Sequence, residues 1–147
     1  MSGWYLAFDK PVPGVEPLPD VGGGREFDML NALAERIGVP AFHDFLSKDM
    51  ILDVLSEEEI AEQFGDHLPP TDWFAPEAGL ATVRAIQAYL SAHPNEPATV
   101  TYPERVHPPR ADYPRTVVTL PDVLGFMETT LAAAQGIGAR FHVGIDI

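Results

Sequence analysis

The sequence predicts a small α+β domain in which one mixed or antiparallel sheet contains both chain termini and is covered by about five helices. Large apolar residues alternate with other residues over 4–8 and again over 141–147, which is the pattern of strands with one buried face. Between them, apolar residues recur at steps of three and four over 26–37, 76–93 and 121–135, the spacing of amphipathic helices. Neither an internal repeat nor a linker divides the 147 residues, so one domain is expected.

The first half of the chain is predicted to be irregular after its opening strand. Prolines between residues 11 and 19, followed by Gly22-Gly23-Gly24, favour a long exposed loop that ends at the helix 26–37. Residues 41–64 are expected to form two or three short helices. Ser56 followed by Glu59 three residues later is a capping-box pattern for the last of them.

The second half begins with the most regular helical pattern in the chain. Pro76 is suited to the first turn of a helix, and Pro94 ends the helix 76–93. Residues 99–102 and 116–119 have the composition of strands within a proline-rich region, and we expect either a two-stranded ribbon or a loop there. Thr119 and Asp122 provide a cap for the helix 121–135.

Composition excludes several functional classes. The chain has no cysteine, which rules out disulfides, thiolate catalysis and thiolate metal sites. Its net charge is −13, and residues 1–75 hold 15 acidic against 4 basic residues. This excess of negative charge opposes binding to nucleic acids and to anionic membranes. It permits binding to a basic partner, or it contributes to solubility alone. No apolar run is long enough for a membrane span and no export signal is recognised, so the cytoplasm is the expected location.

An acidic stretch near the middle of the chain is the first candidate site. Acidic residues crowd the region 49–66 without a basic residue, and on the helix expected from Glu57 they form one face. We predict partner binding through Asp53, Glu58, Glu59 and Glu62, with a solvated face as the simpler alternative and a cation site as the least favoured one. Trp73 joins this prediction as an aromatic anchor, although it equally suits a hydrophobic staple at the entrance to helix 76–93.

A second candidate site is the one locally basic loop. Arg105, His107 and Arg110 could recognise a carboxylate or a phosphate, or could pair with acidic residues of the same chain. His43 and His67, each beside an aspartate, are the histidines best suited to acid–base chemistry. Histidine spacing does not match a zinc site, and no metal or other cofactor is predicted. The Gly22-Gly23-Gly24-Arg25 run lacks the context of a phosphate-binding loop.

Two functional hypotheses follow from these patterns. The first is a non-catalytic acidic binding module, of the inhibitor or immunity type, that docks a basic protein through the acidic stretch. The alternative is a small-molecule-binding protein or hydrolase-like enzyme, which would act on an anionic ligand with His43 or His67 and the basic loop. The sequence contains no catalytic motif that names a reaction.

Overall fold

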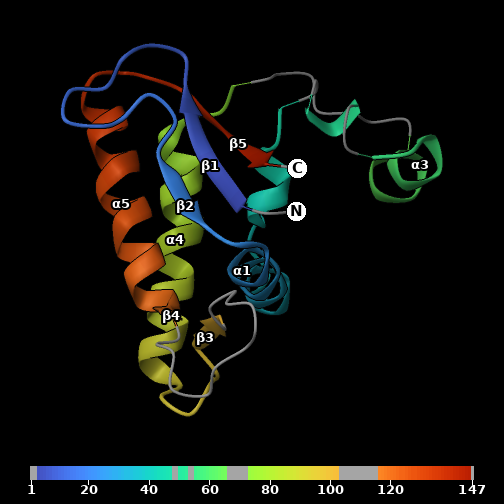
Figure 1. The fold of residues 1–147 in the computed structure, drawn as a ribbon, viewed down its shortest axis with the longest axis vertical. Coiled ribbons are helices and arrows are strands. Elements are labelled where there is room, and N and C mark those ends of the chain that lie inside the picture. Colours follow the sequence, from blue (N-terminus) through green and yellow to red (C-terminus); the bar gives the residue numbers. More distant parts are fainter. Residues whose placement is uncertain (1–2, 48–49, 53–54, 66–72, 103–115, 147) are drawn as a thin grey trace, which may run out of the picture.

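The computed structural model describes residues 3–47, 50–52, 55–65, 73–102 and 116–146, and its elements are shown in Figure 1. At its centre is a three-stranded antiparallel sheet in the order β2-β1-β5. β1 (Gly3–Phe8) pairs with β5 (Phe141–Asp146) along its whole length, so the strands nearest the two termini are neighbours. This confirms the prediction that both ends of the chain lie in one sheet.

The third strand of this sheet was not predicted. β2 (Asp20–Gly22) lies inside the stretch expected to be irregular and pairs with β1 at Trp4 and Tyr5. A strand of three residues directly after a proline is too short to show alternation, and its conformation depends on the neighbour that it pairs with. The backbone N–H of Leu6 donates to the carbonyl of Pro19 at 3.1 Å, which extends this pairing by one bond.

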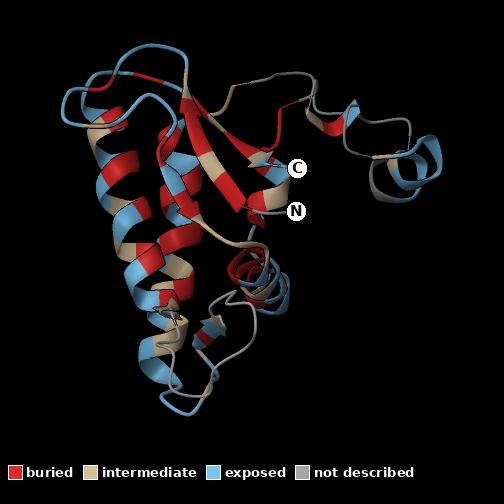
Figure 2. Ribbon diagram, in the orientation of Figure 1, coloured by how far each residue is buried: buried red, intermediate tan, exposed pale blue. Residues whose placement is uncertain are grey.

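Two long helices form a layer against the sheet. α4 (Pro76–Ala92) and α5 (Leu120–Gly136) lie side by side, and their buried residues face each other and the strands (Figures 1 and 2). Gly79 makes the close approach possible, because a Cβ there would lie 2.7 Å from Cζ of Phe141 and 3.1 Å from Cδ1 of Leu131. A residue with little helix propensity is therefore retained where α4, α5 and β5 meet.

α1 (Gly24–Ile37) closes the core beside the sheet, as its apolar stripe predicted. Trp4 of β1 is fully buried, and its ring centroid lies 5.1 Å from that of Phe27 on α1 and 5.6 Å from that of Phe42. Phe42 belongs to the short 3₁₀ helix η1 (Phe42–Phe45). This aromatic group joins the sheet, α1 and η1 into one continuous core.

α3 (Glu57–Phe64) begins at the predicted capping box, in which Glu59 N donates to Ser56 Oγ at 3.2 Å and Ser56 N donates to Glu59 Oε1 at 3.3 Å. In Figure 1 it lies at the edge of the molecule, away from α4 and α5. Its half-buried Ile60 packs against the core cluster.

The proline-rich region forms the two-stranded ribbon, which was one of the two alternatives expected from the sequence. β3 (Thr99–Tyr102) and β4 (Thr116–Thr119) pair as antiparallel strands, with Thr99 opposite Thr119. They form a separate two-stranded sheet next to the start of α5. None of the helices in the described ranges is long and apolar enough to cross a membrane.

Candidate functional site

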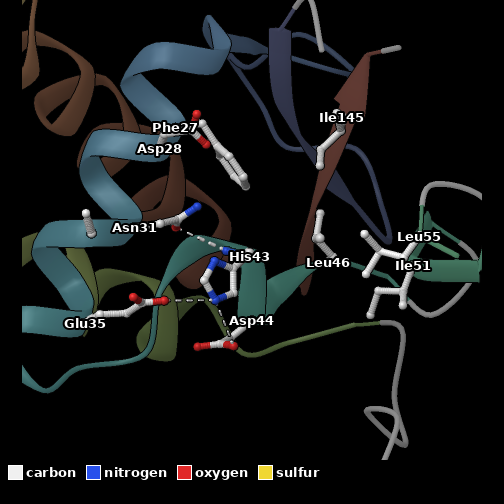
Figure 3. A pocket seen from close by; sticks show the side chains of 11 residues that line it. Phe27, Asp28, Asn31, Glu35, His43, Asp44, Leu46, Ile51, Leu55 and Ile145 are labelled. Atoms are coloured by element: carbon white, nitrogen blue, oxygen red, sulfur yellow. Dashed lines mark hydrogen bonds and ion pairs between the residues drawn. The ribbon is translucent and has the colours of Figure 1, made fainter. Parts of the chain in front are cut away.

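A cavity of about 590 Å³ opens between α1, η1 and β5. Figure 3 shows side chains from these elements converging on it. We call it the acidic pocket, because one side carries carboxylates and the other is apolar. The polar side is formed by Asp28, Asn31, Glu35, His43 and Asp44. The apolar side is formed by Phe27, Leu46, Ile51, Leu55 and Ile145, and Ala32 completes the lining.

The helical repeat of α1 places one edge of this helix along the pocket. Asp28, Asn31 and Glu35 are three and four residues apart, so they share a face next to the buried stripe. Asn31 is 7% exposed and falls on the buried side of that face, whereas Asp28 and Glu35 are exposed. The helix therefore presents two carboxylates at the rim and one amide deeper in.

The Asn31 amide fixes η1 against α1. Its Oδ1 accepts hydrogen bonds from the backbone N–H of Phe42 at 2.7 Å and of His43 at 3.3 Å. These N–H groups belong to the start of η1, where a helix leaves its donors without internal partners. Asp44 completes the cap, since its Oδ2 accepts from the N–H of Ala41 at 2.9 Å. The backbone at the start of η1, including that of His43, is thus held by one buried amide and one carboxylate.

The polar side of the pocket has a strong excess of negative charge. His43 Nε2 lies 3.6 Å from Glu35 Oε1 and 3.6 Å from Asp44 Oδ1, as the dashed lines in Figure 3 show. Among the described residues, this imidazole is the one basic group within 4.0 Å of a pocket carboxylate. The side chains of Glu35 and Asp44 are 66% and 49% exposed, so both are accessible to a partner.

These groups suit binding of a cation better than reaction with an anion. The described lining contains no arginine, lysine, hydroxyl or thiol that would hold a carboxylate or phosphate or act as a nucleophile. Nor does any group of three or more potential ligands within the described ranges have the arrangement for a metal ion. The apolar wall beside carboxylates instead matches a side chain with an aliphatic stem and a charged end.

A second cavity, of about 460 Å³, lies at the other end of α1, where Glu26 serves a structural role. The Glu26 carboxylate is fully buried and accepts hydrogen bonds from the Tyr102 hydroxyl and the Gly23 N–H. Burial and this hydrogen bond raise the pKa of Tyr102 to about 12. Side chains at Gly22 or Gly23 would collide with Glu26 or Tyr102, which accounts for glycine at these two positions. The backbone N–H of Gly23, directly before α1, therefore already has a hydrogen-bond acceptor within the protein.

The residues predicted to bind a partner lie in three different settings. Glu58, Glu59 and Glu62 are all exposed on α3, and Glu59 is engaged in the capping box. Trp73 is half-buried, with its ring centroid 4.4 Å from that of His142. Asp53 lies outside the described residues.

The basic loop predicted to bind an anion, with Arg105, His107 and Arg110, also lies outside the described residues, as does His67. His43 is the one member of that second hypothesis which the described residues place in a pocket. In that pocket its imidazole lies beside the carboxylates of Glu35 and Asp44.

Sequence reasoning did not identify Asp28 and Glu35 as site residues, and it considered Asp44 only as the aspartate beside His43. The signal available was an asparagine at position 31 within the apolar stripe of α1, flanked by acids three residues before and four after. A buried amide of this kind implies backbone groups in need of a partner, but the spacing does not reveal that η1 supplies them. Comparison with known proteins finds no matching family model, curated protein or solved structure.

Proposed function

We propose that this protein is a non-catalytic acidic binding module that docks a basic partner protein, and that the acidic pocket receives a lysine or arginine side chain of that partner. The observation that carries the proposal is the pairing of Asp28, Glu35 and Asp44 with an apolar wall in one cavity. A long basic side chain can bury its methylene groups on that wall while its charged end meets the carboxylates.

The charge of the whole chain supports the same class of partner. The acidic first half would attract a basic surface over a distance of about 8 Å at physiological ionic strength, and so would speed association. The exposed acids of α3 extend this negative surface beyond the pocket. This charge distribution fits an inhibitor or immunity-type protein. We propose in addition that the protein works in the cytoplasm and does not bind nucleic acids.

The test compares charge reversals in the pocket with reversals elsewhere. The double variant Asp28→Lys/Glu35→Lys changes the pocket rim, and Glu58→Lys/Glu62→Lys changes α3. Glu16→Lys/Glu77→Lys is the matched control, since both residues are exposed and lie outside the acidic pocket. The probe is a fluorescent peptide array with lysine or arginine at the centre and apolar neighbours, compared with the same array carrying glutamate.

The pocket variant should bind the basic peptides about tenfold more weakly or worse, because a close charge pair contributes about 1.5 kcal/mol or more. The control variant should lose far less, and the loss should shrink as salt is added. Equal binding by the pocket variant and the control variant would refute the pocket as the docking site. A loss confined to the α3 variant would move the site to α3.

A further inference from the structure

Residues 9–19 join β1 to β2 and follow a fixed path beside α5, although they form neither a helix nor a strand (Figure 1). At the start of this segment, Asp9 forms an ion pair with Arg140, with 3.0 Å between Oδ2 and Nε. At its end, the carbonyl of Pro19 accepts a hydrogen bond from a backbone N–H of β1 at 3.1 Å. Between these points, Val12 is buried against an alanine near the end of α5. The segment is therefore anchored in three places.

A tight turn sets the shape of the segment after its middle anchor. The N–H of Val15 donates to the carbonyl of Val12 at 3.1 Å, and Gly14 has a φ of 77°. Proline followed by glycine with positive φ matches a type II turn, in which both central positions favour these residues. The turn and the anchors together hold Pro13 and the residues after it as a wall opposite α5.

The face of α5 opposite this wall carries a stripe of its own. Phe126, Thr129, Thr130 and Ala133 follow the spacing i, i+3, i+4 and i+7, so they share one side of the helix. A cavity of about 530 Å³ lies between the stripe and the wall, and we call it the loop cavity. Cavities of roughly 300–1,000 Å³ are typical of sites for small molecules. The remaining described lining consists of Pro13, Gly14, Val15, Glu16, Pro19 and Asp20.

Thr130 brings a polar group without a partner to the loop cavity. The residue is 4% exposed, yet within the described ranges its hydroxyl makes no hydrogen bond. The hydroxyl of the neighbouring Thr129 donates to the carbonyl of Gly125 at 3.0 Å, which is the usual partner of threonine in a helix. Among the described side chains, Trp4 Nε1 is the one unpaired polar atom that is closed off from solvent. The Thr130 hydroxyl is not closed off, so it faces the cavity that the residue lines, where a bound molecule can supply its partner.

The rest of the lining determines which kind of molecule fits. Phe126 is 42% exposed, and its ring together with the prolines of the wall offers an apolar surface. Glu16 and Asp20 are exposed and add two carboxylates. The described lining contains no lysine, arginine or histidine that would hold an anion. These groups favour a molecule with an apolar body and a positive charge, and they oppose an anionic one.

We propose that the loop cavity binds a small organic amine, a molecule with an apolar ring and one ammonium group. The ring packs against Phe126 and the prolines, the ammonium group meets Glu16 and Asp20, and the Thr130 hydroxyl completes the hydrogen bonds of the ammonium group. A second copy of this chain is a poor occupant, because it would bring another net charge of −13 to these carboxylates. The inference does not depend on the acidic pocket, which lies between other elements.

The experiment titrates phenethylamine into ¹⁵N-labelled protein and follows the backbone amide shifts by NMR. Phenethyl alcohol and hydrocinnamate serve as neutral and anionic probes with the same ring. The amine should shift the amides of residues 13–20 and 126–133 together. It should bind about tenfold more tightly than hydrocinnamate, because a charge-assisted hydrogen bond is replaced there by repulsion. The alcohol should bind with an affinity between those of the amine and hydrocinnamate.

Three variants test the groups that the proposal assigns. Thr130→Val keeps the branching of the side chain and removes the hydroxyl, so it should weaken amine binding about fivefold to tenfold. Its melting temperature should not fall, because no hydrogen bond within the protein is lost. Glu16→Gln should weaken the amine but not the alcohol. Glu77→Gln is the matched control for charge, since Glu77 is equally exposed and lies outside the loop cavity.

The outcomes that overturn the inference are distinct from those that affect the proposed function. Hydrocinnamate binding as tightly as the amine would overturn it, as would an amine titration that leaves the loop cavity amides unshifted. A fall of more than about 4 °C in the melting temperature of Thr130→Val, with unchanged binding, would show that the hydroxyl already has a partner within the protein. If Asp28→Lys/Glu35→Lys abolishes every amine-induced shift, the amine occupies the acidic pocket, which overturns the loop cavity site and leaves the proposed function standing.

Discussion

Replacing Asn31 by leucine is the most direct test of how the acidic pocket is built. The two side chains have the same branching and the same number of heavy atoms, but leucine cannot accept the hydrogen bonds from the N–H groups of Phe42 and His43. Because Asn31 is 7% exposed, water has little access to replace its oxygen. The variant therefore leaves one buried and one partly buried N–H without a partner.

The expected cost follows from these two donors. An unsatisfied buried N–H costs about 1–3 kcal/mol, and the half-buried His43 N–H should lie at the lower end of that range. The total is about 2–4 kcal/mol in the free energy of unfolding. For a chain of this size, each kcal/mol lowers the melting temperature by about 2–4 °C, so a fall of about 5–15 °C is expected.

The assay is urea unfolding followed by circular dichroism, together with thermal unfolding. The control Asn31→Asp keeps the acceptor oxygen but places a charge at a buried position within one turn of Asp28 and Glu35, so desolvation adds to a repulsion of about 0.5–1 kcal/mol. At a pH low enough to protonate this carboxyl, the stability of the control should lie between those of the wild type and the leucine variant. A leucine variant within about 0.5 kcal/mol of the wild type, with an unchanged urea dependence, would refute the hydrogen-bond argument.

Three further predictions concern the scaffold. Gly79→Ala should lower the free energy of unfolding by about 1–3 kcal/mol, because the added methyl group meets the ring of Phe141; an equally stable variant would show that α4 can shift at no cost. The pKa of Tyr102 is raised by burial and by Glu26 to about 12 from an ordinary value of 10.0, so its stabilising effect is complete below pH 10 and is lost as pH rises through about 12. Tyrosinate absorbance should include a late-titrating component that Tyr102→Phe removes; a late component of the same size in the Tyr102→Phe variant, or none in the wild type, would contradict this. Ser56→Ala should destabilise α3 by about 1 kcal/mol through loss of its cap, measured as faster hydrogen exchange in that helix, whereas unchanged exchange would mean that the cap contributes nothing.

The sequence by itself determined the elements with strong local signals. The 3.6-residue spacing defined α1, α4 and α5, and the alternation around Phe141 and Trp4 defined the two strands that pair with each other. Ser56 and Thr119 marked helix starts because capping depends on a side chain and the backbone a few residues away. These features need no knowledge of the rest of the chain.

Tertiary structure alone decided where the functional groups meet. The acidic pocket joins α1, η1 and the last strand, so residues as distant as Asp28 and Ile145 line the same cavity. Local patterns carry no information about such distances, and sequence reasoning therefore assigned the binding role to the continuous acidic stretch that includes α3. β2 was missed for a similar reason, since three residues acquire strand structure only from the edge of β1.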